Sequence, residues 1–151
     1  MTQSPPAGRS RPAPKHPVIA GYDGSASARN ALAYGAGLAR KLGRPLLVLH
    51  VTLVLAVPGP MNGELITLLT NTERIEKWLH SELDEVAGHS GMDVYVHARQ
   101  GSPGRQLMAA VIDYSADALV IGASRSSSPY LPGSLPAWLV KRARCPVIVV
   151  P

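Results

Sequence analysis

The chain of 151 residues has the length of one globular domain. Hydrophobic residues make up 46% of it and charged residues 17%, a balance that excludes a fully disordered chain and a coiled coil. No apolar run reaches the roughly 18 residues of a membrane span, and the amino-terminal segment lacks the apolar core of a signal peptide. We therefore expect a cytoplasmic protein. Cys145 is the single cysteine, which excludes an internal disulfide and a CxxC metal or redox site.

The formal net charge is +5, but the basic residues are unevenly distributed. Arg9, Arg11 and Lys15 lie near the amino terminus, and the rest of the chain holds 12 basic against 10 acidic residues. Phenylalanine is absent and aromatic residues make up 5%, so the stacking surfaces of a nucleic-acid binder are poorly supplied. Proline, which lacks a backbone donor, is concentrated in the same basic segment. Residues 1–16 are predicted to be a disordered tail and residues 17–151 one domain.

Beyond the tail, short aliphatic runs alternate with longer segments of helical periodicity, a pattern typical of βα units around a parallel sheet. Several runs are almost continuously apolar, as expected when helices cover both faces of the sheet. The expected strands span residues 17–23, 45–51, 93–99, 116–123 and 145–151.

The first predicted helix runs from Ser25 to Leu42, with Ser25 as its N-cap and Gly43 as its stop. The segment between Leu53 and Asn71 contains two prolines and two glycines, so we expect a long loop with one turn of helix near Ile66. A second helix is expected to begin near Thr72. Its expected buried positions are Ile75, Leu79, Leu83 and Val86.

Two further helices are predicted in the carboxyl-terminal half. One follows Ser102 as cap and Pro103 as first residue, a position where the missing proline donor costs nothing. The other starts around Ser134. The residues expected to face the core are Met108, Val111 and Ile112 in the first of these helices, and Trp138 and Leu139 in the second.

Ligands of open parallel sheets bind outside the carboxyl ends of the strands, so the segments that follow the strands are the candidate sites. Gly21–Ser25 and Gly122–Ser134 are the two such segments with site-like composition. The second ends in Gly133-Ser134 at an expected helix start, where backbone N–H groups and the helix dipole attract an anion such as phosphate. A serine there is also a common N-cap with no ligand at all, and both interpretations stand.

Several enzyme motifs are incomplete. Gly122-Ala-Ser124 lacks the second glycine of a G-x-S-x-G nucleophile elbow, and neither G-x-x-x-x-G-K-S/T nor G-x-G-x-x-G occurs. The histidines do not show H-x-x-x-H or H-E-x-x-H spacing, and Cys145 has only Arg144 as a neighbouring activator. No catalytic residue and no metal site is assigned.

Together these segments resemble the universal stress protein family. The resemblance rests on DGS after the first strand, LHV ending the second, GSPGRQL before the third helix, ADALVIGAS in the fourth strand and the ending ARCPVIVVP. It covers essentially residues 17–151. It implies an α/β fold of the adenine nucleotide alpha hydrolase type: an open five-stranded parallel sheet, order 3-2-1-4-5, with helices on both faces. It also implies a homodimer in which the last strands pair.

Many members of that family bind ATP through a G-x-x-G-x9-G-S/T loop, whose glycines let the backbone wrap the phosphates. Gly122 matches the first glycine, and Gly133 and Ser134 match the closing pair. Arg125 stands at the second glycine, and only seven residues separate it from Gly133. The arginine either obstructs the phosphates or binds them with bidentate hydrogen bonds, and the sequence leaves both open.

The resemblance further implies that the Asp23 carboxylate approaches the ribose and that the Val51 backbone meets the adenine edge. A turn-forming aspartate and a simple strand end are the alternatives at these two positions. The expected nucleotide-binding residues are Tyr22, Asp23, Val51, Gly122, Ala123, Arg125, Gly133 and Ser134.

The sequence therefore predicts a homodimeric stress-response module that binds ATP, with Mg²⁺, or another adenine nucleotide. Its final strand, Val147 to Val150, is short, apolar and expected at a sheet edge. An uncovered edge presents unpaired backbone N–H and C=O groups, which favour pairing with another strand. The alternative is a nucleotide-free dimer that recruits another protein. A slow ATPase ranks last because no positioned base, P-loop lysine or metal carboxylate pair is evident.

Overall fold

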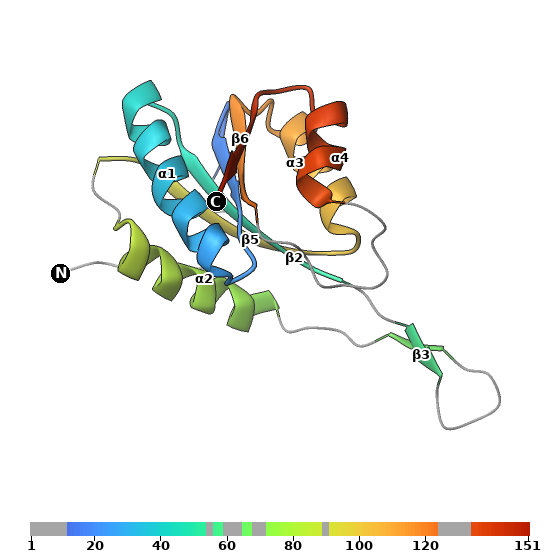
Figure 1. Ribbon diagram of the computed structural model, residues 1–151. Helices are drawn as coiled ribbons and strands as arrows, with labels where there is room; N and C mark the ends of the chain where they lie inside the picture. Colours follow the sequence, from blue (N-terminus) through green and yellow to red (C-terminus); the bar gives the residue numbers. More distant parts are fainter. Residues whose placement is uncertain (1–11, 54–55, 59–64, 68–71, 89–90, 124–133) are drawn as a thin grey trace.

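The computed structural model describes residues 12–53, 56–58, 65–67, 72–88, 91–123 and 134–151. A five-stranded parallel sheet forms its centre, with strands in the order β5-β2-β1-β6-β7 (Figure 1). The strands are β1 (Val18–Gly21), β2 (Leu46–Thr52), β5 (Val94–Gln100), β6 (Ala118–Gly122) and β7 (Val147–Val150). Each strand lies within its predicted segment or extends past the end of that segment by one residue. Numbered among these five strands, the order in the sheet is the predicted 3-2-1-4-5.

Helices cover both faces of this sheet, as predicted. Helices α1 (Ala26–Leu42) and α2 (Thr72–Val86) lie on one face, and α3 (Pro103–Asp113) and α4 (Leu135–Arg142) on the other (Figure 1). In β1, Val18 and Ala20 join the core under α1, and Ile19 joins the core under α3. All three are fully buried, which explains why the inner strands are continuously apolar rather than alternating.

The ends of α1 follow the predicted local chemistry. Ser25 is the N-cap, and its Oγ accepts a hydrogen bond from the Ala28 N–H at 3.2 Å. Gly43 ends the helix at φ 64°, a left-handed conformation that glycine adopts without steric cost. The Ser25 cap places the amino end of α1 directly after the carboxyl end of β1.

The core-facing residues of the other helices agree with prediction except at one position. Leu79 and Leu83 of α2 and Leu139 of α4 are fully buried. Ile112 of α3 is 54% exposed, so its predicted inward orientation is wrong. The reason is the phase of the helix: the buried stripe of α3 runs through Gly104, Leu107, Ala110 and Val111, and the next residue turns about 100° away from it.

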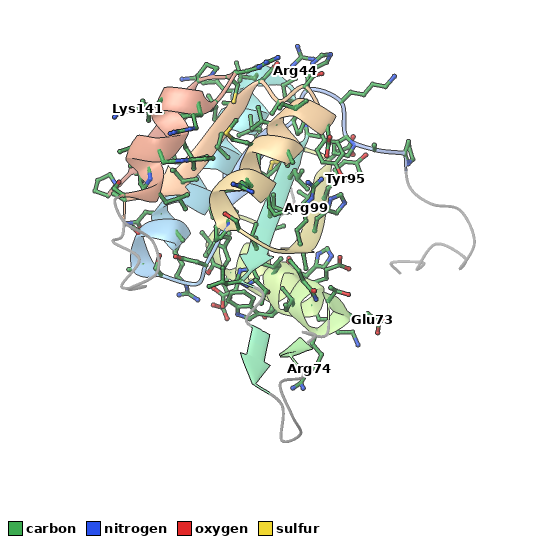
Figure 2. The ribbon with its side chains drawn as sticks, turned by 90° about the vertical axis from the view of Figure 1, so that its right-hand side faces the viewer. Arg44, Glu73, Arg74, Tyr95, Arg99 and Lys141 are labelled. Carbon is green, nitrogen blue, oxygen red and sulfur yellow. The ribbon has the colours of Figure 1, made fainter. Side chains whose placement is uncertain are left out.

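The segment predicted as a loop with a helical turn contains two short strands instead. The strands β3 (Ala56–Pro58) and β4 (Leu65–Thr67) pair antiparallel, with Val57 opposite Ile66. This hairpin lies away from the sheet, near Glu73 and Arg74 at the amino end of α2 (Figures 1 and 2). The helical turn near Ile66 is therefore wrong, because pairing with a second strand decides the conformation of such a short aliphatic run.

Ordered contacts begin inside the segment predicted to be a disordered tail. Pro14 is buried. The His16 N–H donates to the Tyr114 carbonyl at 3.1 Å, and the His16 Nδ1 lies 3.0 Å from the Ser115 carbonyl oxygen. The carbonyls at the end of α3 have no partner within the helix, so the incoming chain satisfies them. Residues 14–16 of the predicted tail thus contact the domain, and residues 1–11 lie outside the described part.

In the part of the chain that the structure describes, no helix is long and apolar enough to cross a membrane. The same residues hold no group of three or more histidine, cysteine or acidic side chains that could bind a metal ion.

Candidate functional site

A pocket of about 190 Å³ lies at the carboxyl ends of β1, β2 and β6. The chain leaves β1 toward α1 on one face of the sheet and leaves β6 toward α4 on the other. The helices that follow these two adjacent strands therefore lie on opposite faces of the sheet. Such a position is the switch point where open α/β sheets bind their ligands. The amino ends of α1, α3 and α4 contribute to the same pocket.

Apolar side chains form most of its wall. They are Leu49 and Val51 of β2, Leu107 of α3, Ile121 of β6 and Leu135 of α4. A concave apolar surface with a few polar groups at its rim is the usual setting for a flat, partly apolar ligand.

Asp23 lines the pocket and is exposed at its rim. Its Oδ1 accepts a hydrogen bond from the Ser25 N–H at 2.9 Å, and Gly24 between them has φ 83°. The turn-forming alternative for Asp23 is therefore confirmed. An ionised carboxylate offers about four acceptor positions, so this turn also holds an acceptor at the pocket with capacity for a ligand hydroxyl.

Tyr22 lines the pocket as well, but its side chain is engaged elsewhere. It is 3% exposed, and its hydroxyl donates to the Glu82 carboxylate of α2. Burial, reinforced by the hydrogen bond to this carboxylate, raises the pKa of Tyr22 to about 12. The phenol therefore keeps its proton at neutral pH and remains a donor to Glu82.

Gly122 lines the pocket, and the structure gives it a second reason to be glycine. A Cβ at this position would lie 2.7 Å from the Ala28 nitrogen and 2.6 Å from the Ser27 Oγ. The residue after it, Ala123, is exposed, and its N–H donates to the Val150 carbonyl at 2.8 Å. Gly122 thus allows α1 to start close to β6, and the Ala123 amide is used by β7.

The predicted anion site at the start of α4 has fewer donors than a typical helix end. Ser134 is the N-cap, and its Oγ accepts from the Ala137 N–H at 3.2 Å. Pro136 in the same turn has no N–H. Leu135 and Pro136 line the pocket. Arg125 and Gly133 lie outside the described residues.

The structure thus brings Tyr22, Asp23, Val51 and Gly122 together around one pocket. Ser134 directly precedes lining residues of α4, whereas Ala123 lies outside the lining. Of the apolar wall, only Val51 is expected at the site from the sequence, and Ser25 is expected there only as the end of the candidate segment Gly21–Ser25. The first turns of α3 and α4, Ser-Pro and Ser-Leu-Pro, mark where this wall begins. The sequence indicates a helix start at the first and a helix start with a candidate anion site at the second.

Comparison with known proteins agrees with this architecture. UspA, a universal stress protein from Lactobacillus plantarum, aligns with a TM-score of 0.62 and 21% identity over 93% of this chain and 100% of that one. A universal stress protein in complex with cAMP aligns with a TM-score of 0.66 and 19% identity over 92% and 99%. One from Archaeoglobus fulgidus in complex with dAMP aligns with a TM-score of 0.60 and 23% identity over 92% and 100%.

At these identities the structural matches show a shared fold, the adenine nucleotide alpha hydrolase type that the sequence predicts. No curated protein matched the sequence. The model of the universal stress protein family, however, matches residues 15–151, which include every strand and helix described above. The chain therefore belongs to the universal stress protein family.

Proposed function

We propose that the pocket of this universal stress protein binds an adenine nucleotide, with ATP as the first candidate. The observation that carries the proposal is an apolar pocket of about 190 Å³ at the switch point, with the Asp23 carboxylate held at its rim. Two proteins of the same fold were solved with cAMP and dAMP, which supports a nucleotide of this class.

The lining divides into regions that suit the parts of a nucleotide. The apolar wall around Val51 and Leu107 suits the base, and the Asp23 carboxylate suits a ribose hydroxyl. The phosphates would extend toward the start of α4. Since the described residues hold no cluster of metal ligands, Mg²⁺ would enter with the phosphates, whose oxygens and water complete its coordination.

Calorimetric titration of ATP, ADP and cAMP into the purified protein tests the proposal. Asp23→Ala should weaken binding by about 1–3 kcal/mol, the contribution of a hydrogen bond to a charged acceptor. Asp23→Asn keeps an acceptor for the Ser25 N–H and separates loss of charge from loss of the turn. Asp113→Ala removes a carboxylate that pairs with Arg99 outside the pocket, and it should bind like wild type. No wild-type affinity for any of these nucleotides below millimolar concentration would contradict the proposal.

Arg125→Gly addresses the departure from the family loop, because it restores the family residue. Tighter ATP binding in this variant would mean that the arginine obstructs the phosphates. Weaker binding would mean that the arginine is a phosphate ligand, a role for which its guanidinium geometry is suited.

The alternative, a nucleotide-free interaction module, is favoured by one observation. In the first turn of α4, Pro136 has no N–H and the Ala137 N–H donates to the Ser134 Oγ. This turn therefore binds an anion less strongly than a helix start whose N–H groups are unused.

We propose that the protein is a homodimer formed through β7, whether or not it binds a nucleotide.

We also favour nucleotide binding over hydrolysis, because Asp23 alone carries a carboxylate among the described residues that line the pocket. Phosphate release in the presence of Mg²⁺ tests this.

A further inference from the structure

A connected group of side chains lies behind the pocket, on the α1 and α2 face of the sheet. It consists of Tyr22, His50, Trp78 and Glu82, here called the Tyr22 cluster, and it joins β1 and β2 to α2. Apart from Tyr22, its members lie outside the pocket lining. The cluster therefore reaches the pocket through Tyr22 and the loop that carries Asp23.

Tyr22 is held at four points. Its N–H donates to the Leu49 carbonyl at 2.9 Å, and its carbonyl accepts from the His50 Nδ1 at 2.7 Å. Its hydroxyl donates to the Glu82 carboxylate, and its ring lies 5.5 Å from the Trp78 ring, centroid to centroid. Because a carbonyl only accepts, His50 carries its proton on Nδ1 here. Backbone and side chain of the residue before Asp23 are thus both fixed.

Trp78 also contacts the residue after Asp23. A Cβ on Gly24 would lie 3.1 Å from the indole ring, so the loop lies directly against this side chain. The indole also meets the His50 ring edge to face, with centroids 5.4 Å apart. One side of α2 therefore packs against both neighbours of the aspartate.

Arg29 of α1 connects Glu82 to a second carboxylate of α2. Its guanidinium lies 2.9 Å from the Glu82 Oε2 and 3.2 Å from the Glu85 Oε2. Both carboxylates pair with the same arginine, but the hydroxyl of Tyr22 reaches Glu82. This difference supplies a matched pair of variants.

We propose that α2 positions the Asp23 carboxylate through Tyr22, Trp78 and Glu82, and that it thereby sets the affinity of the pocket. The second clause rests on the proposed nucleotide function, whereas the first does not. Asp23 and the Ser25 N–H close a turn at 2.9 Å, and packing of the residues on both sides holds the geometry of such a turn more precisely. Tyr22, Trp78 and Glu82 are positioning residues, which act on the site through the aspartate.

The test compares Tyr22→Phe and Glu82→Ala with the control Glu85→Ala. Tyr22→Phe keeps the ring against Trp78 and removes only the hydroxyl. The first readout is amide hydrogen exchange at Ser25, whose N–H is bound by Asp23, and the second is the ATP affinity by titration. We expect Ser25 exchange to accelerate and ATP binding to weaken, each roughly 5- to 20-fold, in the two cluster variants.

Three comparisons separate positioning from simple stabilisation. Glu85→Ala should match wild type in both readouts. In the double variant Tyr22→Phe, Glu82→Ala, ATP affinity and Ser25 exchange should change no more than in the more strongly affected single variant. The reason is that both changes remove the same hydrogen bond. Glu82→Gln keeps an acceptor for the Tyr22 hydroxyl, so its Ser25 exchange and ATP affinity should stay close to those of the wild type.

If Ser25 exchange in the cluster variants equals that of Glu85→Ala, the proposal is wrong, whatever happens to their melting temperature. If exchange accelerates but the wild type binds no nucleotide, positioning is supported and the proposed function fails. If the wild type binds ATP and the cluster variants bind it equally well, control of affinity by α2 is overturned and nucleotide binding stands.

Discussion

Two glycines of this protein have opposite environments, although both lie in regular secondary structure. Gly122 faces the start of α1 so closely that a Cβ would lie 2.7 Å from the Ala28 nitrogen, whereas a Cβ on Gly37 of α1 would meet nothing within 4 Å. The first glycine serves packing, and the second costs α1 conformational entropy.

We therefore expect opposite changes in stability from the same substitution. Gly122→Ala should lower the free energy of unfolding by about 1–3 kcal/mol, because α1 must move away from β6. Gly37→Ala should raise it by about 0.5–1 kcal/mol, the ordinary gain of helix propensity. Urea denaturation of both variants checks this. Destabilisation by both substitutions to a similar extent would contradict it.

The Tyr22 hydroxyl predicts how stability depends on alkaline pH. Burial first, and the Glu82 hydrogen bond second, raise the pKa of Tyr22 to about 12 in the folded protein, against about 10 in an unfolded chain. Between these values the unfolded chain has lost the proton and the folded one keeps it. The contribution is therefore complete below pH 10 and is lost as pH rises toward 12.

Tyr22→Phe should make the fall of unfolding free energy between about pH 10 and 12 less steep. Tyr34→Phe is the matched control, because Tyr34 is 51% exposed, and it should keep the wild-type slope. Urea denaturation at several pH values measures both. Identical slopes for the two variants would show that Tyr22 ionises alike in the folded and unfolded states.

At the scale of elements, the amino-terminal segment joins the domain where α3 ends. His16 bonds to the carbonyls of Tyr114 and Ser115, and Pro14 is buried. Deleting residues 1–16 should lower stability by about 1–2 kcal/mol, because these hydrogen bonds are lost. Deleting residues 1–11 should change stability very little. Thermal unfolding of both truncated proteins compares them, and a similar loss in the two would mean that residues 1–11 stabilise the domain.

At the scale of the whole molecule, β7 occupies one edge of the sheet and β5 the other. In β7, Val149 is 38% exposed, whereas Ile148 packs against the core under α1. Val149 is thus the residue at which a charge tests the edge without opening the core. A short apolar edge of this kind favours pairing with a second copy.

Val149→Glu should shift the proposed dimer toward monomer in sedimentation at micromolar concentration, because a carboxylate would be placed where the two edges meet. Ile112→Glu places the same charge on an aliphatic residue of α3 that is 54% exposed, and it should leave the dimer intact. A monomeric wild type would contradict the dimer. A dimer unaffected by Val149→Glu would contradict assembly through β7.

The sequence by itself determined the features that depend on neighbouring residues. The caps Ser25 and Gly43 of α1, and the cap Ser134 that begins α4, follow from hydrogen bonds and backbone conformations within one turn. The five strands of the sheet follow from aliphatic runs that two layers of helices bury. Family resemblance supplied the strand order and the placing of Asp23, Val51 and Gly122, which the pocket brings together.

Only the tertiary structure decided features that join distant parts of the chain. The β3–β4 pair, the contact of Gly122 with α1 and the exposure of Ile112 each depend on how elements pack. The hydrogen bond from Tyr22 to Glu82 spans 60 residues, and no local pattern marks either residue as its partner. Local rules set conformation over a few residues, whereas which side chains meet across the sheet depends on its twist and on the docking of the helices.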